Sequence, residues 1–119
     1  MPFEPKQKVD LDPPKDDIIG LDFLAKCDGK NPEYPTYVAI KGTVFDVSGN
    51  KAYSPDGSYH VFTGKDASRA LAQSSLKPED CRPEWDDLSD EHKKVLDDWY
   101  IFFSKRYNIK GKVAGASNL

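Results

Sequence analysis

The stretch Tyr37-Val-Ala-Ile-Lys-Gly-Thr-Val-Phe-Asp-Val47 carries a strong signal for the fold. Two runs of β-branched and aromatic residues are joined there by Lys41-Gly42. Two residues ending in glycine between two such runs are typical of a β-hairpin. The sequence therefore predicts two paired strands, at 37–40 and 43–47.

Helical patterns lie on both sides of this hairpin. Residues 18–27 predict a short buried turn or helix that stops at Asp28-Gly29, and a second helix begins at Asp66 and ends around Ser74–Ser75. A third follows Ser89, a good N-cap, with apolar side chains at helical spacing as far as Tyr107. Short strands precede the helices without β–α–β alternation, so the expected fold class is α+β.

Length and composition predict one domain. The chain has 119 residues, of which 38% are hydrophobic, enough for one core without disulfides. Residues 1–17 contain four prolines and little apolar periodicity, so we expect a mobile N-terminal tail. The folded domain is expected over residues 18–113, with a flexible C-terminal tail over 114–119.

Charge and hydropathy argue against several classes of protein. The formal net charge of −3 gives no basic footprint for nucleic acid. The longest apolar run, Trp99 to Phe103, is far shorter than the roughly 20 residues that cross a bilayer. The N-terminus has no signal-peptide core, and two cysteines make no disulfide framework. We expect a soluble, reduced, intracellular chain without a membrane span.

The loop Tyr53-Ser-Pro-Asp-Gly-Ser-Tyr59-His60 places two phenols and an imidazole on a segment stiffened by proline and glycine. Ligands on a stiff loop lose little conformational freedom on binding, so this arrangement suits a cofactor cradle. Aromatic residues in a loop more often pack or form a surface patch, and that alternative stays open. By periodicity alone, Tyr107 is the last core residue of an amphipathic helix.

Read together, several segments resemble the membrane-associated progesterone receptor family, a branch of the cytochrome b5-like haem/steroid-binding fold. The resemblance runs from about Leu21 to Val113 and is closest to the progesterone receptor membrane components and the fungal damage-resistance proteins. The matching motifs are Val44-Phe45-Asp46-Val47, Tyr53-x-Pro55-x-Gly57-x-Tyr59, Phe62-x-Gly64-x-Asp66-Ala67-Ser68-Arg69, Asp86-Asp87-Leu88-Ser89 and Trp99 to Tyr107.

The resemblance implies a haem b (iron protoporphyrin IX) site and a role for five residues. Tyr59 would be the axial ligand of ferric iron through its phenolate oxygen, with Tyr53 in contact or hydrogen-bonded near the iron. Tyr107 would line the haem edge, and Arg106 could pair with a propionate. Asp66 matches an acid beside the pocket, where we expect it to cap the helix that borders the haem.

The sequence around each of the two histidines differs from that in cytochrome b5 itself, because neither histidine stands in a His-Pro-Gly-Gly segment. Neighbouring positions on an extended loop point to different sides, so we expect His60 not to share the iron with Tyr59. His60 remains the alternative ligand. We expect His92, among charged residues, to be a solvated surface side chain.

Other metal or nucleophile chemistry has less support in the sequence. Cys27, His60, Cys81 and His92 lack the close pairs of a structural zinc site. No oxyanion loop supports a Cys–His nucleophile. Both cysteines are therefore expected to be core or surface thiols.

The resemblance implies a haem-dependent regulator of sterol-modifying cytochrome P450-type monooxygenases, not itself an enzyme, at the cytosolic face of the endoplasmic reticulum. A phenolate ligand stabilises ferric iron, which argues against the alternative of a one-electron carrier. A steroid-binding interaction module without haem is a third hypothesis, and haem-mediated dimerisation a further one. The acid-rich stretch 78–98 is either a solvated helix face or a docking surface for a basic partner.

Overall fold

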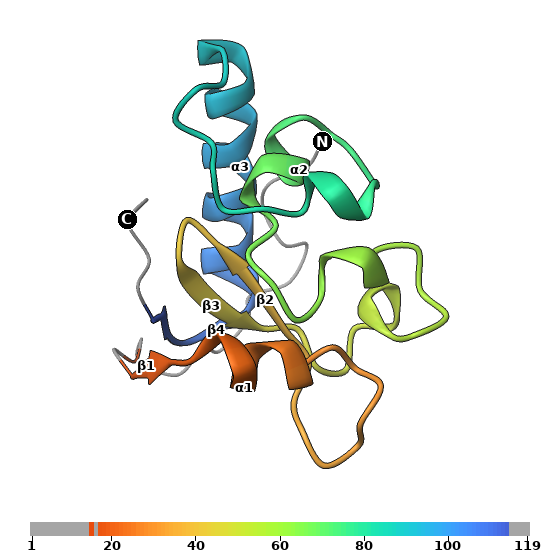
Figure 1. Ribbon diagram of the computed structural model, residues 1–119. Coiled ribbons are helices and arrows are strands. Elements are labelled where there is room, and N and C mark those ends of the chain that lie inside the picture. The colour runs from red at the N-terminus through yellow and green to blue at the C-terminus, as the bar shows by residue number, and fades with distance from the viewer. Residues whose placement is uncertain (1–14, 16, 115–119) are drawn as a thin grey trace.

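The computed structural model describes residue 15 and residues 17–114 (Figure 1), and most of both predicted tails lies outside these residues. A four-stranded sheet in the order β1-β4-β3-β2 forms the base of the fold. Its strands are β1 (Ile18–Ile19), β2 (Tyr37–Ile40), β3 (Thr43–Asp46) and β4 (Asn108–Val113). Neighbouring strands are antiparallel except β1 and β4, which run parallel.

The predicted hairpin is confirmed as β2 and β3. Tyr37 pairs with Asp46 and Ile40 with Thr43. The connecting residues Lys41 and Gly42 have φ angles of 53° and 77°. Positive φ at both central positions matches the twist of the flanking strands, and glycine adopts it without steric cost.

The three predicted helical segments are present with shifted boundaries. They are α1 (Leu21–Lys26), α2 (Ser68–Ala72) and α3 (Asp90–Arg106). The expected N-cap of α3 is confirmed, because the Ser89 hydroxyl accepts a hydrogen bond from the backbone N–H of His92. The α2 helix starts two residues later than predicted, since the chain around Asp66 makes a β-bridge with Ala39.

Strands β1 and β4 were not predicted from the sequence. Ile18 and Ile19, predicted as part of the helical segment, pair with Lys112 and Val113 of the strand that follows α3. The backbone of Gly111 has a φ of 155°, and a Cβ there would lie 2.2 Å from the carbonyl oxygen of Asp17. Glycine at this position therefore lets the N-terminal segment approach β4.

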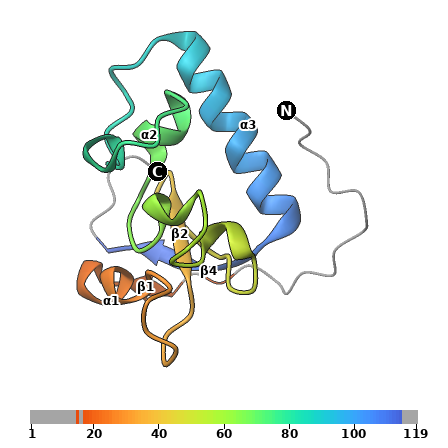
Figure 2. The ribbon, with the colours of Figure 1, turned by 90° about the vertical axis from the view of Figure 1, so that its right-hand side faces the viewer.

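The sheet lies between two hydrophobic clusters. Figure 2 shows α1 on one side of the sheet and α2 and α3 on the other. Alternate residues of a strand face opposite sides, so Phe45 joins the larger cluster and Val44 the smaller. Phe45 packs edge-on against Phe103 of α3, with ring centroids 5.4 Å apart. This contact positions the C-terminal half of α3 over the sheet.

Among the described residues, no helix combines the length and the apolar character that crossing a bilayer requires.

Candidate functional site

The loop between β3 and α2 holds two short 3₁₀ helices, η1 (Lys51–Tyr53) and η2 (His60–Phe62). The Asn50 side chain caps η1 by accepting from the Ala52 N–H at 3.0 Å. The Tyr59 N–H donates to the Ala52 carbonyl at 2.8 Å, and this bond brings the ends of the loop together. A Cβ on Gly57 would lie 2.2 Å from the same carbonyl oxygen, so only glycine fits there.

Three tyrosines meet where this loop packs against the end of α3, and we call Tyr53, Tyr59 and Tyr107 the tyrosine cluster. The ring centroid of Tyr53 lies 5.8 Å from that of Tyr59 and 6.3 Å from that of Tyr107. On α3, Trp99 stands edge-on to Tyr59 at 6.5 Å, and Phe103 lies 5.0 Å from Tyr107. Figure 2 shows this loop beside the lower half of α3.

The three phenols differ in their access to solvent. Tyr53 is 3% exposed and Tyr107 9%, whereas Tyr59 is 36% exposed. Burial, and then the neighbouring Tyr107 and Tyr59, raise the pKa of Tyr53 well above its usual value, so its hydroxyl stays protonated. The Asn50 amide donates to the Tyr107 hydroxyl oxygen at 2.6 Å. Tyr59 is therefore the most accessible residue of the cluster.

Arg106 lies beside the cluster at the exposed end of α3. Its guanidinium carbon is 5.8 Å from the centroid of the Tyr107 ring, in cation–π contact. The structure thus brings four of the five predicted site residues together.

Asp66 occupies a different place, between the hairpin and α2. One carboxylate oxygen accepts from the N–H of Ser68 at 3.0 Å and from its hydroxyl at 2.5 Å, and the other accepts from the Gly42 N–H at 2.9 Å. The side chain is buried. Asp66 therefore joins the start of α2 to the hairpin turn, as an anchor of the scaffold.

The histidines lie apart from each other in the fold. The His60 Nε2 is 2.8 Å from the carbonyl oxygen of Asp28, and because a carbonyl only accepts, this nitrogen carries the proton. The Thr63 hydroxyl lies 2.7 Å from the carbonyl oxygen of His60 and 3.1 Å from that of Asp28, so it also lies between η2 and the end of α1. His92, expected to be a solvated surface residue, is half-buried in the first turn of α3.

Both cysteines are buried free thiols, as expected for core residues. Burial, followed by the charges of Asp28 and Asp46, raises the pKa of Cys27 to about 11. The Cys81 thiol contacts the carbonyl oxygen of Val61 at 3.5 Å. Across residues 15 and 17–114, no three His, Cys, Asp or Glu side chains gather in a way that could hold a metal ion.

Three residues of the site, Asn50, Trp99 and Phe103, and a separate cavity were not predicted from the sequence. The role of Asn50 has no local signal, because its bond to Tyr107 spans 57 positions. Trp99 and Phe103 were recognised as apolar positions, and the spacing 99, 103, 107 was the available signal that they form one wall. The cavity, of about 520 Å³, lies beside α1, and none of the three clustered tyrosines lines it.

Comparison with known proteins identifies the family to which this chain belongs. Residues 22–101 match the family described as Cytochrome b5-like Heme/Steroid binding domain, and the chain belongs to this family. A solved structure of a hypothetical Arabidopsis thaliana protein with a cytochrome b5 like fold superposes with a TM-score of 0.74 at 38% identity. The match covers 82% of this chain and 90% of the other. The predicted α+β class and cytochrome b5-like fold are thus confirmed.

Individual relatives show to which branch of this family the chain belongs. Probable steroid-binding protein 3 of Arabidopsis thaliana is 42% identical, over 76% of this chain and 91% of its own length. The cytochrome P450 regulator dap1 of Schizosaccharomyces pombe is 36% identical, over 76% of this chain and 70% of its own. The human membrane-associated progesterone receptor component 2 is 39% identical, over 80% of this chain and 44% of its own. The predicted membrane-associated progesterone receptor branch is therefore confirmed, and the chain spans less than half of the human relative.

Proposed function

We propose that this domain binds ferric haem b through the phenolate oxygen of Tyr59 and, when loaded, regulates cytochrome P450-type monooxygenases of sterol biosynthesis. One observation carries the proposal: three tyrosines converge from a stiff loop and a helix end, and only Tyr59 has substantial exposure. A phenolate is an established type of haem ligand.

The residues present suit this group chemically. The buried ring of Tyr53 and the partly buried ring of Trp99 pack against Tyr59, so the proposed ligand stands on an aromatic support. The Arg106 guanidinium, exposed beside Tyr107, could pair with a propionate as a bidentate donor. Haem, when bound, would supply an iron centre whose ferric state an anionic oxygen ligand stabilises.

The neighbouring side chains would keep the three phenols in distinct roles. Tyr53 keeps its proton because of its raised pKa, so it could donate a hydrogen bond toward a ligand oxygen but would not compete as an anion. The Asn50 amide donates a hydrogen bond to the Tyr107 hydroxyl oxygen and so fixes its position. The bond from His60 to Asp28 leaves only Nδ1 of that ring for other contacts, which favours Tyr59 as the ligand.

The regulatory part of the proposal draws on the relative in Schizosaccharomyces pombe that is named as a cytochrome P450 regulator. We propose that this domain acts in the same way, as a partner and not a catalyst, at the cytosolic face of the endoplasmic reticulum. The acid-rich stretch 78–98 would then meet a basic partner surface. Such association should weaken as salt concentration rises.

A haem titration followed by absorption tests the ligand. We expect Tyr59→Phe to weaken haem binding by at least about tenfold and to change the ferric spectrum, because the phenyl ring has no oxygen. The matched control is Tyr34→Phe, since Tyr34 is a partly buried tyrosine packed on Phe23 of α1, outside the cluster. An unchanged spectrum in Tyr59→Phe, or rapid reversible reduction of the loaded protein by a flavoprotein reductase, would contradict the proposal.

A further inference from the structure

The side chain of Asn50 is held by two hydrogen bonds, one within its loop and one to the end of α3. Its Oδ1 accepts from the backbone N–H of Ala52 at 3.0 Å, and its Nδ2 lies 2.6 Å from the hydroxyl oxygen of Tyr107. The backbone of Asn50 is held as well. Its N–H donates to the Val47 carbonyl at 3.1 Å, and its carbonyl accepts from the Tyr53 N–H at 3.0 Å. The amide group is therefore fixed in place.

The bond to Ala52 decides which end of the amide faces Tyr107. A backbone N–H only donates, so the side-chain atom that it contacts must be the carbonyl oxygen of Asn50. The amide nitrogen therefore faces Tyr107. Because that nitrogen also only donates, the Tyr107 oxygen is the acceptor. The direction of this long-range hydrogen bond thus follows from the local one.

This direction leaves the hydrogen of the Tyr107 hydroxyl unused. A phenol accepts and donates at the same time, and Asn50 occupies only its accepting side. Within the part of the chain that the structure describes, no acceptor for this hydrogen is found. Tyr107 is 9% exposed and its ring packs on Tyr53 and Phe103, so the side chain has little freedom to turn. The hydroxyl is therefore a donor with a restricted direction.

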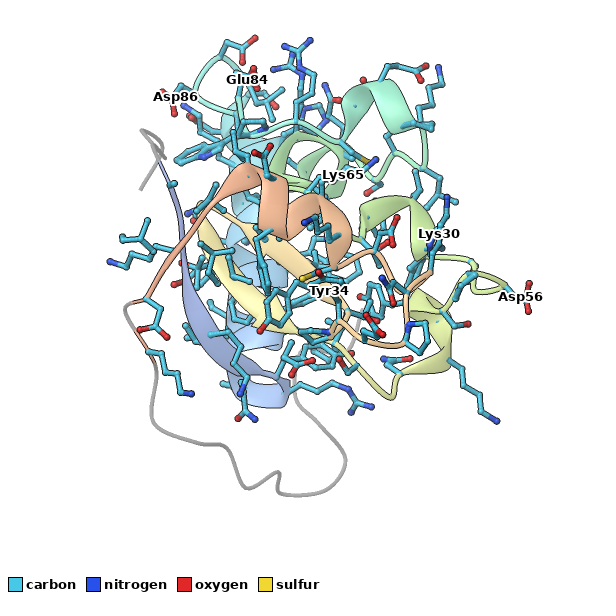
Figure 3. All side chains as sticks on the ribbon, turned by 60° about the horizontal axis from the view of Figure 1, so that its bottom comes forward. Lys30, Tyr34, Asp56, Lys65, Glu84 and Asp86 are labelled. Atoms are coloured by element: carbon cyan, nitrogen blue, oxygen red, sulfur yellow. The ribbon has the colours of Figure 1, made fainter. Side chains whose placement is uncertain are left out.

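The charges around this hydroxyl favour an anionic acceptor. The Arg106 guanidinium carbon lies 5.8 Å from the centroid of the Tyr107 ring. Among the acids of the neighbouring elements, Asp46 accepts from the Ser48 N–H at 2.9 Å. Asp56 lies at the outer tip of the loop, as Figure 3 shows. An anionic oxygen beside Tyr107 would thus meet one hydrogen-bond donor and one cation.

We propose that Asn50 is a positioning residue of the haem site, which occupies the accepting side of the Tyr107 hydroxyl and so presents its hydrogen to an anionic oxygen in the occupied site. The inference rests on the proposed haem function and deepens it, because it assigns selectivity to a residue that acts through Tyr107. A hydrogen bond to a charged acceptor is strong, and a donor that is already oriented does not lose freedom when the bond forms.

Two substitutions separate this role from the capping of η1. Asn50→Ser keeps an oxygen for the Ala52 N–H but is too short to reach Tyr107. Asn50→Asp keeps the cap and the reach, but its oxygens only accept, so the Tyr107 hydroxyl would donate to it and turn away from the site. We expect haem affinity to fall about threefold in Asn50→Ser and at least about tenfold in Asn50→Asp. Equal haem affinities of the native chain and Asn50→Asp would overturn the proposal.

Asn31 offers a matched control. Its Oδ1 accepts from the N–H of Glu33 at 2.9 Å, two residues further on, as that of Asn50 does from Ala52. Asn31 is exposed and lies outside the tyrosine cluster. Asn31→Ser and Asn31→Asp should therefore leave haem affinity unchanged. A tenfold loss in Asn31→Asp would assign the effect to net charge and contradict the role of Asn50.

A double-mutant cycle with Tyr107→Phe tests whether Asn50 acts through the hydroxyl. Tyr107→Phe removes that group, so the further change Asn50→Ser should have no additional effect on haem affinity. If Asn50 only held the loop in place, Asn50→Ser would weaken haem binding by the same factor in both backgrounds. That result would overturn the proposal.

The hydrogen bond itself is tested without haem, in a ¹H–¹⁵N correlation spectrum of the whole chain. Asn50→Ser assigns the side-chain amide signals of Asn50. We expect these signals to shift in Tyr107→Phe and to stay in place in Tyr34→Phe, because Tyr34 lies outside the cluster. Haem uptake by a chain whose Asn50 amide does not respond to Tyr107→Phe would refute only the role of Asn50. A native chain that takes up no haem would refute the proposed function itself.

Discussion

Tyr53 and Tyr59 are six positions apart on one loop, yet their surroundings give them different chemistry. Tyr53 is buried among Tyr107 and Phe103, and its raised pKa keeps it neutral. Tyr59 packs against Tyr53, Phe62 and Trp99 but remains partly exposed to solvent. Exposure, more than residue type, therefore distinguishes the proposed ligand from its neighbours.

Asp66 contributes to this site from a distance, by fixing the scaffold. We expect Asp66→Ala to lower the free energy of unfolding by about 3 kcal/mol, because the N–H groups of Gly42 and Ser68 lose their buried, charged acceptor. Asp66→Asn, with a single acceptor oxygen, should lose less. Urea unfolding measures the free energy of unfolding of both variants. The control is Asp56→Ala, at an exposed loop residue (Figure 3). An Asp66→Ala chain as stable as Asp56→Ala would show that these bonds contribute little.

At the scale of elements, α3 connects the core to the site. Its Leu96 and Phe103 are fully buried against the rest of the larger hydrophobic cluster, while Trp99 reaches the tyrosine loop. Arg106 and Tyr107 then fall at the end of the helix. A shift of α3 along its axis would separate Tyr107 from Asn50 and Tyr53, so the helix sets the geometry of the cluster.

The start of α3 should contribute measurably to stability. We expect Ser89→Ala to cost about 1 kcal/mol, because the N–H of His92 loses the hydroxyl that caps the helix. Ser104→Ala is the control: the Ser104 hydroxyl bonds the Tyr100 carbonyl within the helix, and alanine favours helix there. Thermal melts measure the stability of the two variants. A larger loss of stability in Ser104→Ala than in Ser89→Ala would contradict the assigned cap.

Local patterns predicted some elements and could not predict others. The hairpin and α3 are encoded by neighbouring residues, through turn chemistry at Lys41-Gly42 and a cap at Ser89. Strands β1 and β4 depend on pairing across the whole chain, with Ile18 opposite Lys112. The hydrogen bond between Asn50 and Tyr107 is similarly long-range. The convergence of the tyrosines was therefore implied by family resemblance, and periodicity alone assigned Tyr107 only to the core.

At the scale of the whole molecule, two buried groups have raised pKa values, the Cys27 thiol and the Tyr53 phenol. They predict that the free energy of unfolding decreases at alkaline pH. The thiol of Cys27 ionises at about pH 9 when unfolded and at about pH 11 when folded, so the unfolded state binds fewer protons between these values. Stability is therefore fully present below pH 9 and falls as the pH rises above it. The raised pKa of Tyr53 acts in the same direction above its ordinary value of 10.

Urea midpoints at pH 7, 9 and 10.5 measure this dependence. We expect a clear decrease between pH 9 and 10.5 in the native chain, and a smaller one in Cys27→Ala, which lacks the titrating thiol. A decrease of the same size in Cys27→Ala would assign the effect to other groups.

The ligand of the iron is the central claim, and the electron paramagnetic resonance spectrum of the ferric haem complex tests it most directly, recorded for the native chain and for Tyr59→Phe. A single tyrosinate ligand predicts a high-spin, five-coordinate ferric signal in the native chain that is lost in Tyr59→Phe. A low-spin signal retained in Tyr59→Phe would contradict the account and point to His60 or another residue as the ligand.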